Sequence, residues 1–377
     1  MKKAIRVLSI FGTRPEAVKM APVVKALQET AGIVSRVCVT AQHREMLDQV
    51  LTQFKIKPHH DLNLMRPDQS LSGLTAEILT HLEPVWASEH PDWVLVQGDT
   101  TTVMTASLAA FYRGIKVGHV EAGLRTGDKR QPFPEEINRR ITGVIADLHF
   151  APTEFNRQNL LREGIRDECI KVTGNTVIDA LQQISQFPPP AQVADWLDRW
   201  GIQSGERRLI LVTAHRRENF GEPIRNICQG LRLLAERYGD SIRILYPVHL
   251  NPNIQEPVYG LLKNMDQVIL TSPVDYLSLV HLMKASVIVL TDSGGIQEEA
   301  TGLGKPTLVL RNKTERPEGV EAGVLKLVGS DPDLILNEAS RLLDDEKAYM
   351  AMAHAVNPFG DGHAAGRIVK AILDYPC

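Results

Sequence analysis

Carboxylates and arginines gather in one stretch of the chain, HVEAGLRTGDKRQPFPEEINRR, which covers residues 119–140. The last two of its acids follow a proline where a helix is expected to begin, and the full set is Glu121, Asp128, Glu135 and Glu136. Carboxylates can transfer protons, and they can equally be solvated surface charge. The choice between these interpretations depends on the elements that position the acids.

A second motif, TDSGGIQEEATGLGKP at residues 291–306, predicts an anion site. A strand runs into Ser293, Gly294 and Gly295, and a helix begins there. Glycines let a ligand approach the backbone, the N–H groups of the first helical turn point outward, and the serine adds a hydroxyl donor. Glu299, about one turn into the helix, suits ribose hydroxyls better than phosphate. An ordinary strand–turn–helix with an N-cap is the alternative.

The segment FGTRPEAVKMAP at residues 11–22 repeats this arrangement near the start of the chain. Gly12 permits the turn, Pro15 suits the first helical position, and Arg14 at the helix entrance could pair with a pyrophosphate. Lys19 follows one turn later, where a solvated helix lysine is the alternative. The segment matches neither the Walker pattern nor G-x-G-x-x-G, so a dinucleotide site has little support.

Two histidines and one further acid stand at the ends of predicted strands. TAHRREN contains His215, and PVHLNP contains His249. Imidazole can donate to phosphate, and imidazolium can stabilise a departing one, although a single strand-end histidine is more often structural. QGDTTT offers Asp99, which could act in chemistry or cap the helix that is expected to start at Thr101.

Composition indicates a globular protein of two domains. The 377 residues are 43% apolar and 23% charged, and the net charge of −3 gives no sign of a nucleic-acid or membrane surface. The four cysteines form no C-x-x-C pair, and Cys38 lies in an apolar strand-like run where a buried thiol is expected. The N-terminus lacks a signal-peptide pattern and no apolar run reaches membrane-spanning length, which favours a cytoplasmic protein.

Short β-branched runs alternate with helical patterns, which predicts α/β domains with parallel sheets. The first domain is expected over residues 1–174, with a C-terminal helix in 361–377 that packs back on it, and the second over 175–360. The proline run SQFPPPAQV lies near the boundary and is unsuited to strand or helix. We expect two doubly wound, Rossmann-like domains that face a central cleft, with ligands at the carboxyl ends of the strands.

The periodicity also predicts individual elements. Helices are expected at 15–28, 71–87, 101–112 and 364–374. Strands are expected at AIRVLSIF, SRVCVT, WVLVQGD, IKVGHVEA, DLHFAPT and IKVTG in the first half, and at RLILVTAH, IRILYPVH, QVILTSP, SVIVLTDSGG, PTLVLR and VLKLVG in the second.

The predicted ligand carries a diphosphate, a ribose and a further group, which describes a nucleotide sugar. The chain resembles the non-hydrolysing UDP-N-acetylglucosamine 2-epimerases in FGTRPEAVKMAP, VTAQHREMLDQVL, GDTTT, GHVEAGLRTGDK, PEEINRRITG, TGNTVIDAL, TAHRREN, YPVHLNPN, TDSGGIQEEA, ERPEGVEAG and NPFGDG. The resemblance runs over essentially the whole chain. It implies a GT-B fold, interconversion of UDP-GlcNAc and UDP-ManNAc for surface polysaccharide synthesis, and a homodimer.

The resemblance also implies a mechanism and a set of residues. UDP is eliminated to give 2-acetamidoglucal and is then re-added, with a proton returned on the opposite face of C2, so two proton-transfer groups are needed. Glu136 is expected to be a solvated neighbour of the catalytic acids. The implied catalytic residues are Asp99, Glu121, Glu135 and His215, and the implied substrate and UDP contacts are Arg14, Lys19, Ser293, Gly294, Gly295, Glu299 and Arg316.

Some positions depart from the family's pattern. Val274 and Leu279 stand near the expected uracil pocket where the family often has Gln or Leu and then an aromatic residue. Some bacterial members bind a second UDP-GlcNAc as an activator. The positions that match this second site are Gln42, Gln69, Arg216 and His249, while Glu45 and Asp68 depart from it.

Three rival functions use the same nucleotide motifs. A GT-B glycosyltransferase would need an acceptor surface, and a hydrolysing epimerase usually carries a fused kinase domain; neither is visible in the sequence. A non-catalytic nucleotide-sugar sensor would keep Ser293, Gly294 and Glu299 but would not require the acids. No zinc-like spacing appears, and we expect neither a metal nor another cofactor.

Overall fold

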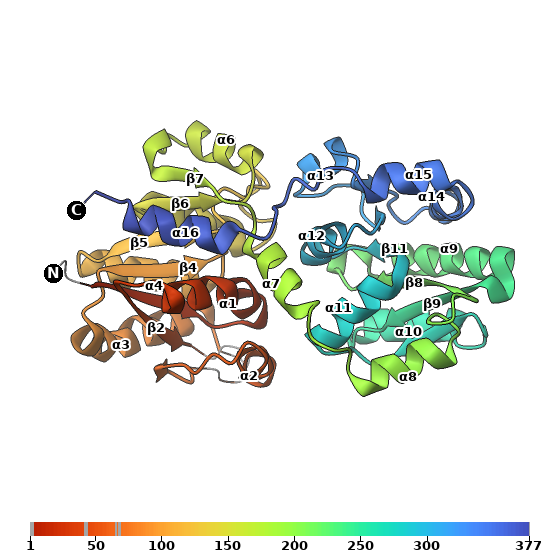
Figure 1. Cartoon of the computed structure of the whole chain (residues 1–377), viewed down its shortest axis with the longest axis horizontal. Coiled ribbons are helices and arrows are strands. Elements are labelled where there is room, and N and C mark those ends of the chain that lie inside the picture. The colour runs from red at the N-terminus through yellow and green to blue at the C-terminus, as the bar shows by residue number, and fades with distance from the viewer. Residues whose placement is uncertain (1–3, 41–43, 65, 67–68, 377) are drawn as a thin grey trace. The chain divides into compact units, whose positions relative to one another are not determined.

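The computed structural model describes residues 4–40, 44–64, 66 and 69–376, and the chain divides into two compact units (Figure 1). Unit 1 comprises the residues up to Ala180 and from Phe359 onward, and unit 2 runs from Leu181 to Pro358. The sequence placed the boundary at 174–175, a few residues before the observed one.

Unit 1 is built on a seven-stranded parallel sheet in the order β3-β2-β1-β4-β5-β6-β7. Successive strands are added in one direction from β1 to β3 and in the opposite direction from β4 to β7. The carboxyl ends of β1 and β4 therefore form the switch point at which such folds bind ligands. The strands are β1 (Ile5–Phe11), β2 (Ile33–Val39), β3 (His60–Asp61), β4 (Trp93–Gln97), β5 (Lys116–Val120), β6 (Leu148–Ala151) and β7 (Ile170–Val172).

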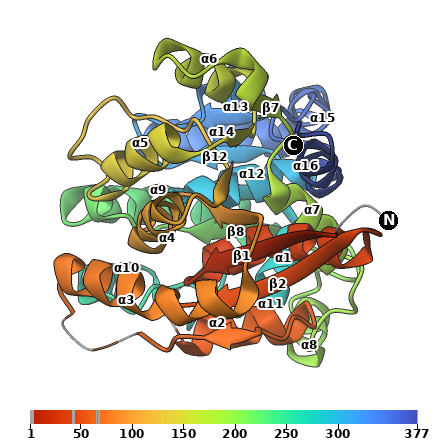
Figure 2. The ribbon, with the colours of Figure 1, turned by 90° about the vertical axis from the view of Figure 1, so that its left-hand side faces the viewer.

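Helices cover both faces of this sheet, because right-handed crossovers in opposite directions leave on opposite sides. Helices α3, α4 and α5 pack side by side on one face, and α1, α2 and α16 pack together on the other (Figure 2). The helices of the unit are α1 (Arg14–Glu29), α2 (Arg44–Gln53), α3 (Leu71–Glu89), α4 (Thr101–Tyr112), α5 (Glu135–Ile145), α6 (Glu154–Arg162), α7 (Thr176–Ile184, which crosses the boundary) and α16 (Ala364–Leu373).

The C-terminal helix α16 belongs to unit 1, where it packs against α1. Its first turn has no side-chain cap of its own. Instead, the buried carboxylate of Asp179 on α7 accepts the backbone N–H groups of Ala364 at 3.2 Å and Ala365 at 2.9 Å. An acid at a helix N-terminus satisfies donors that otherwise lack a partner, so α7 fixes the start of α16.

Unit 2 has a six-stranded parallel sheet in the order β10-β9-β8-β11-β12-β13, with its switch point between β8 and β11. The strands are β8 (Arg208–Thr213), β9 (Ile242–Pro247), β10 (Val268–Thr271), β11 (Ser286–Thr291), β12 (Thr307–Val309) and β13 (Leu325–Leu327). The helices are α8 (Ala191–Arg199), α9 (Glu222–Tyr238), α10 (Pro252–Leu262), α11 (Tyr276–Ala285), α12 (Gly294–Gly302), α13 (Pro317–Glu321), α14 (Pro332–Asp344) and α15 (Glu346–Ala353).

Each sheet has its own buried apolar core. In unit 1, strand residues such as Leu8 and Val94 pack against helix residues such as Ile78, and in unit 2 Ile210 packs in a cluster that includes Leu231. Strands buried on both faces read as continuous apolar runs, which is why the sequence revealed them. No helix of the described residues is long and apolar enough to span a membrane.

The structure confirms the predicted α/β class with two parallel sheets, and it corrects local details. Strand β3 was not predicted, because its two polar residues carry no pattern; they pair with Cys38 and Val39 of β2. The proline run ends in a helix: Pro190 is the N-cap of α8, which begins at Ala191. Cys38 is a buried free thiol, as predicted, and burial raises the pKa of its thiol to about 12.

Candidate active site

Glu121 lies at the carboxyl end of β5 and is almost fully buried. Its carboxylate accepts hydrogen bonds from the Lys19 ammonium, from Gln97 Nε2 and, at 3.1 Å, from Asn175 Nδ2. Lys19 therefore lies against an acid of the site, which argues against a solvated helix lysine. The donors come from α1, β4 and the residue before α7, so three segments converge on one acid.

The backbone of Glu121 is also unusual, with φ of 64°. This left-handed conformation costs a non-glycine residue about 1–2 kcal/mol, and such residues gather at functional sites where the surroundings fix them. Gly98, with φ of 82°, lies beside it and donates its N–H to Val120 at 3.0 Å. The register of β4 and β5 therefore sets the Glu121 carboxylate next to the end of β4.

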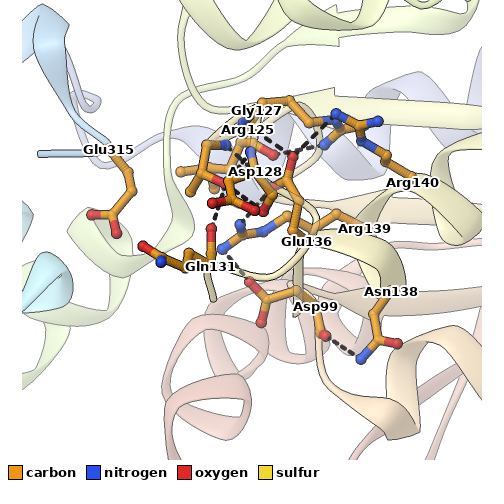
Figure 3. A network of polar contacts seen from close by, with 12 residues as sticks. Asp99, Arg125, Gly127, Asp128, Gln131, Glu136, Asn138, Arg139, Arg140 and Glu315 are labelled. Carbon is orange, nitrogen blue, oxygen red and sulfur yellow. Dashed lines mark hydrogen bonds and ion pairs between the residues drawn. The ribbon is translucent and has the colours of Figure 1, made fainter. Parts of the chain in front are cut away.

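Asp99 follows the end of β4 and is held from α5 by two contacts (Figure 3). Arg139 Nη2 lies 2.5 Å from Asp99 Oδ2, and Asn138 Nδ2 donates to the Asp99 carbonyl at 2.9 Å. The structure excludes the capping alternative, because Thr100 is the N-cap of α4 and accepts the Val103 N–H at 3.3 Å. The Asp99 carboxylate is thus not used as a helix cap, and its partner is Arg139.

Arg139 connects these acids electrostatically. Burial by itself would lower the pKa of its guanidinium, but the negative charges of Asp99, Glu136 and Glu121 together raise that pKa above its ordinary value. Arg139 is therefore a permanent cation among several carboxylates.

Glu135, the first residue of α5, is partly buried, and its Oε2 is buried without a hydrogen-bond partner among the described residues. Residues four apart share one face of a helix, so Glu135 lies beside Arg139. A buried carboxylate oxygen without a protein partner at a polar site suits a group that exchanges a proton with substrate.

Glu136 was expected to be a solvated neighbour, and this is wrong. It is completely buried, and it accepts the N–H groups of Thr126 at 3.2 Å and Gly127 at 3.3 Å (Figure 3). It also pairs with Arg139 at 3.2 Å and Arg140 at 3.5 Å. Glu136 thus fixes both the loop after β5 and the arginine that contacts Asp99.

Sequence reasoning also missed Glu16, which is buried at the start of α1. Its carboxylate accepts the N–H groups of Gly12 at 2.8 Å and Thr13 at 2.6 Å, and the Thr100 hydroxyl at 2.6 Å. Burial raises the pKa of Glu16, and these hydrogen bonds act in the opposite direction. The T-x-x-E spacing of a capping box could have revealed it. Arg14, on the same turn, makes no side-chain hydrogen bond or ion pair with the described residues, and its role as a phosphate partner stays a prediction.

In unit 2, the predicted anion loop joins β11 to α12. Ser293 is the N-cap of α12, but its side chain makes no capping bond, so the hydroxyl is not used by the helix. A Cβ on Gly294 would collide with the Arg316 guanidinium, so glycine lets this arginine lie over the helix start. Arg316 Nε in turn donates to buried Glu298 at 2.6 Å. The structure thus brings a cation to the predicted phosphate loop, which also contains Gly295.

Glu299 is buried on α12, where its Oε1 accepts the Tyr276 hydroxyl at 3.0 Å. Sequence reasoning named Glu299 as the ribose partner but missed Tyr276. Of the two positions that depart from the family's pattern, Leu279 is buried on α11 and Val274 is partly buried just before it.

His215 follows β8, and its ring stacks on that of His249 with centroids 5.5 Å apart and planes 16° apart. Its Nδ1 lies 3.6 Å from Oδ1 of buried Asp292. Burial lowers the pKa of His215, Asp292 opposes this shift, and Arg216 and His249 reinforce it.

The proposed activator residues are only partly described. Gln42 and Asp68 lie outside the described residues, as does the side chain of Glu45. Gln69 Nε2 donates to Glu77 at 2.9 Å, while Arg216 and His249 are exposed in unit 2. Within the part of the chain that the structure describes, no group of three or more His, Cys, Asp or Glu side chains could hold a metal ion.

Comparison with known proteins identifies the family of this chain. A family model described as UDP-N-acetylglucosamine 2-epimerase matches residues 25–373. A UDP-N-acetylglucosamine 2-epimerase of Salmonella typhimurium is 53% identical over 98% of this chain and 99% of its own. The chain belongs to the UDP-N-acetylglucosamine 2-epimerase family.

Solved structures of this epimerase family agree. A Neisseria meningitidis UDP-GlcNAc 2-epimerase bound to UDP-GlcNAc has a TM-score of 0.89 and 49% identity, covering 98% of this chain and all of that one. A Methanocaldococcus jannaschii UDP-GlcNAc 2-epimerase in complex with UDP-GlcNAc and UDP has a TM-score of 0.80 and 34% identity, covering 98% and 99%. Family membership therefore extends over both units.

Proposed function

We propose that the protein interconverts UDP-N-acetylglucosamine and UDP-N-acetylmannosamine by inverting C2 of the sugar. The observation that carries this proposal is the set of acids at the switch point of unit 1. Asp99 forms an ion pair with Arg139, and the charge of Glu121 also raises the pKa of this arginine. Glu135 lies one helical turn before Arg139 on α5. Inversion requires a proton to leave one face of C2 and return to the other, and a set of several acids supports this better than a single base would.

The C2–H bond is not next to a carbonyl, so it is not acidic in the bound substrate. In the proposed reaction the C1–O bond to UDP breaks and the oxygen keeps the electron pair. The C2 proton passes to a carboxylate, and the electrons of the C–H bond form the C1–C2 double bond of 2-acetamidoglucal. UDP then adds back to C1, while a second acid delivers a proton to the opposite face of C2. Asp99, Glu121 and Glu135 are the proposed acids.

The remaining residues bind the leaving group. We assign the diphosphate to Arg14, Ser293, Gly294, Gly295 and Arg316, with His215 stabilising its charge as it departs, and the ribose to Glu299. Lys19 lies against Glu121 and is assigned to the sugar side of the substrate. No metal or other cofactor has a part in this scheme.

Proton NMR of UDP-GlcNAc with the enzyme in deuterated water tests the proposal. Deuterium should appear at C2 of both sugars without any acceptor, and UDP-ManNAc should accumulate. A glycosyltransferase would need an acceptor, a hydrolysing enzyme would release free ManNAc, and a sensor would leave the spectrum unchanged. Each of these three results would contradict the proposal.

We also propose a homodimer that forms through α4 and α5, which pack together in unit 1. The polar side of α5 is buried and its apolar side is exposed: Val144 is 84% exposed, and Phe111 on neighbouring α4 is 61% exposed. A helix whose apolar side faces outward in one chain suits a second copy. Val144→Glu should give monomers in light scattering, whereas Val356→Glu, equally exposed in unit 2, should remain dimeric. A monomeric wild-type protein would rule the proposal out.

We further propose that UDP-GlcNAc activates the enzyme at a second site that includes Arg216 and His249 of unit 2. In that case UDP-ManNAc alone should react with a lag that a trace of UDP-GlcNAc removes. Arg216→Gln should abolish the effect of the trace. Progress curves without a lag in the wild type would contradict activation.

We place the protein in the cytoplasm. Free thiols at Cys38 and Cys228, both buried, fit a reducing compartment. Cell fractionation would test this, and recovery in the periplasmic fraction would contradict it.

A further inference from the structure

Two strand ends at the switch point of unit 2 bring an acid and a histidine together. In the register of β8 and β11, Thr213 pairs with Thr291, and their hydroxyls bond at 2.7 Å. Asp292, the residue after β11, donates its N–H to the Thr213 carbonyl at 3.1 Å. The Asp292 carboxylate therefore reaches the segment that follows β8, which contains His215.

The two oxygens of the Asp292 carboxylate have different surroundings. Oδ2 accepts the backbone N–H groups of His215 and Arg216 and the side-chain amide of Asn219, each at 2.8 Å. Oδ1 is buried and has no hydrogen-bond partner among the described residues. The His215 Nδ1 atom lies 3.6 Å from it, slightly beyond a hydrogen bond.

These contacts separate a structural role from a chemical one. The three bonds to Oδ2 are sufficient to hold the segment after β8 in place. Oδ1 adds nothing to that, and leaving a buried carboxylate oxygen unsatisfied costs free energy. A small rotation of the imidazole would close the gap, so a proton on Nδ1 would satisfy this oxygen.

We propose that Asp292 is a positioning residue for His215, whose Nδ1 proton it accepts. This fixes the ring, stabilises the imidazolium form and directs Nε2–H toward the departing diphosphate. The inference rests on the proposed role of His215 in the epimerase reaction. The charged or titratable groups that act on this ring are Asp292, Arg216 and His249, and only Asp292 favours its protonation.

The variant Asp292→Asn tests the proposal because it can keep the structural contacts. Its amide oxygen can replace Oδ2 and accept the same three N–H groups. Its NH₂ group then replaces Oδ1 and faces Nδ1, which must become an acceptor. The imidazolium is no longer stabilised. We expect kcat to fall about 10- to 100-fold, with KM and UDP affinity little changed.

The pH profile provides a readout that a structural role would not move. A step that needs imidazolium slows as the pH rises through the pKa of His215. Because Asp292→Asn removes the group that favours protonation of His215, the falling limb of the profile of kcat against pH should shift to lower pH. Asn219→Ala is the matched control: it removes one bond to Oδ2, so it should lower stability and leave the limb in place.

Nitrogen-15 NMR of the wild-type protein with UDP gives a second measurement, with His215→Gln used for assignment. It should show a proton on Nδ1 of His215. This test stands whether or not Asp292→Asn folds, and it does not require turnover, so its failure is distinct from a failure of the epimerase assay. A neutral ring with Nδ1 unprotonated, or an unmoved pH limb with unchanged kcat in Asp292→Asn, would overturn the proposal.

Discussion

At the switch point of unit 1, the carboxylate of Glu121 is held by side chains, whereas at that of unit 2 the carboxylate of Asp292 is held mainly by backbone N–H groups. Lys19 neutralises Glu121, while Asp292 has a histidine as its charged or chargeable neighbour. In the function that we propose, side chains from separate segments hold an acid that exchanges protons with substrate. Backbone donors fix an acid so that its charge acts on another residue. The same fold thus uses buried acids in two ways.

The largest expected effect is that of Glu121→Gln. This change keeps the shape of the side chain but removes the proton carrier and the counter-ion of Lys19. Turnover should fall by ~10²–10⁴-fold, the usual contribution of a general acid or base, while UDP affinity survives. Deuterium exchange at C2 and titration calorimetry with UDP measure the two quantities.

The control for Glu121→Gln is Glu154→Gln on α6, whose side chain is 61% exposed. It should exchange deuterium at the wild-type rate. Exchange at that rate in Glu121→Gln as well would remove Glu121 from proton transfer, and the contrast between the two switch points would be lost.

Glu136→Gln should mainly affect stability. The neutral amide cannot offset the positive charges of Arg139 and Arg140. Its NH₂ group would also replace one carboxylate oxygen and would there face the N–H donors that this oxygen accepts. We expect the free energy of unfolding to fall by about 2–4 kcal/mol, and turnover to fall as well because Arg139 is no longer fixed against Asp99. Urea denaturation measures the first effect. An unchanged midpoint would show that the buried charge of Glu136 is dispensable.

Acidification should weaken unit 1 through two buried histidines. Burial lowers the pKa of His119 to about 3 and that of His149 to about 4. Below a pH of about 6.5 the unfolded chain binds protons that the folded unit does not, so stability is lost as the pH falls toward these values, by up to about 1.4 kcal/mol per pH unit for each histidine.

Hydrogen exchange in peptides from β5 and β6, compared at about pH 7 and about pH 5, would detect this loss. His149→Phe should reduce the pH dependence, while the exposed His354→Ala in unit 2 should not. Equal protection of β5 and β6 at both pH values would contradict the prediction.

The smallest expected effect is that of Tyr276→Phe, which removes the hydroxyl that Glu299 accepts. An ordinary intramolecular hydrogen bond contributes about 0.5–1.5 kcal/mol, so UDP affinity should weaken by about 2- to 13-fold at most. Calorimetry with UDP measures this, and Tyr259→Phe on α10 is the control. The same titration is repeated with 2′-deoxy-UDP and 3′-deoxy-UDP. If Tyr276→Phe weakens the binding of both analogues as much as it weakens the binding of UDP, Glu299 does not act through the ribose hydroxyls.

Much of the fold could be predicted because buried parallel strands are continuous apolar runs. Helix α4, for example, has the predicted bounds of Thr101 and Tyr112. The convergence of Asp99 and Glu121 also followed from the sequence, since parallel strands align their carboxyl ends. Strand β3 could not be predicted, because its two polar residues show no strand pattern and its pairing with β2 is a tertiary contact.

The contrast between Glu135 and Glu136 could not be predicted for a different reason. Neighbouring helical residues point in directions about 100° apart, and an apolar side normally identifies the buried direction. In α5 that rule fails: Val144 and Ile137 are exposed, while Glu136 and Thr142 are buried. The contacts of Glu136 with Thr126 and Gly127, and of Asn138 with Asp99, show that the polar side faces inward.

The return of α16 to unit 1 has a consequence for biosynthesis. The ribosome makes the chain from its N-terminus, and α16 comes after the whole of unit 2. Until it emerges, α1 lacks one of its packing partners and the Asp179 carboxylate lacks the N–H groups of Ala364 and Ala365. Domains usually mature in the order of their synthesis. Here the continuous unit 2 can finish first, and the nascent unit 1 waits with an uncovered apolar surface that a chaperone can recognise.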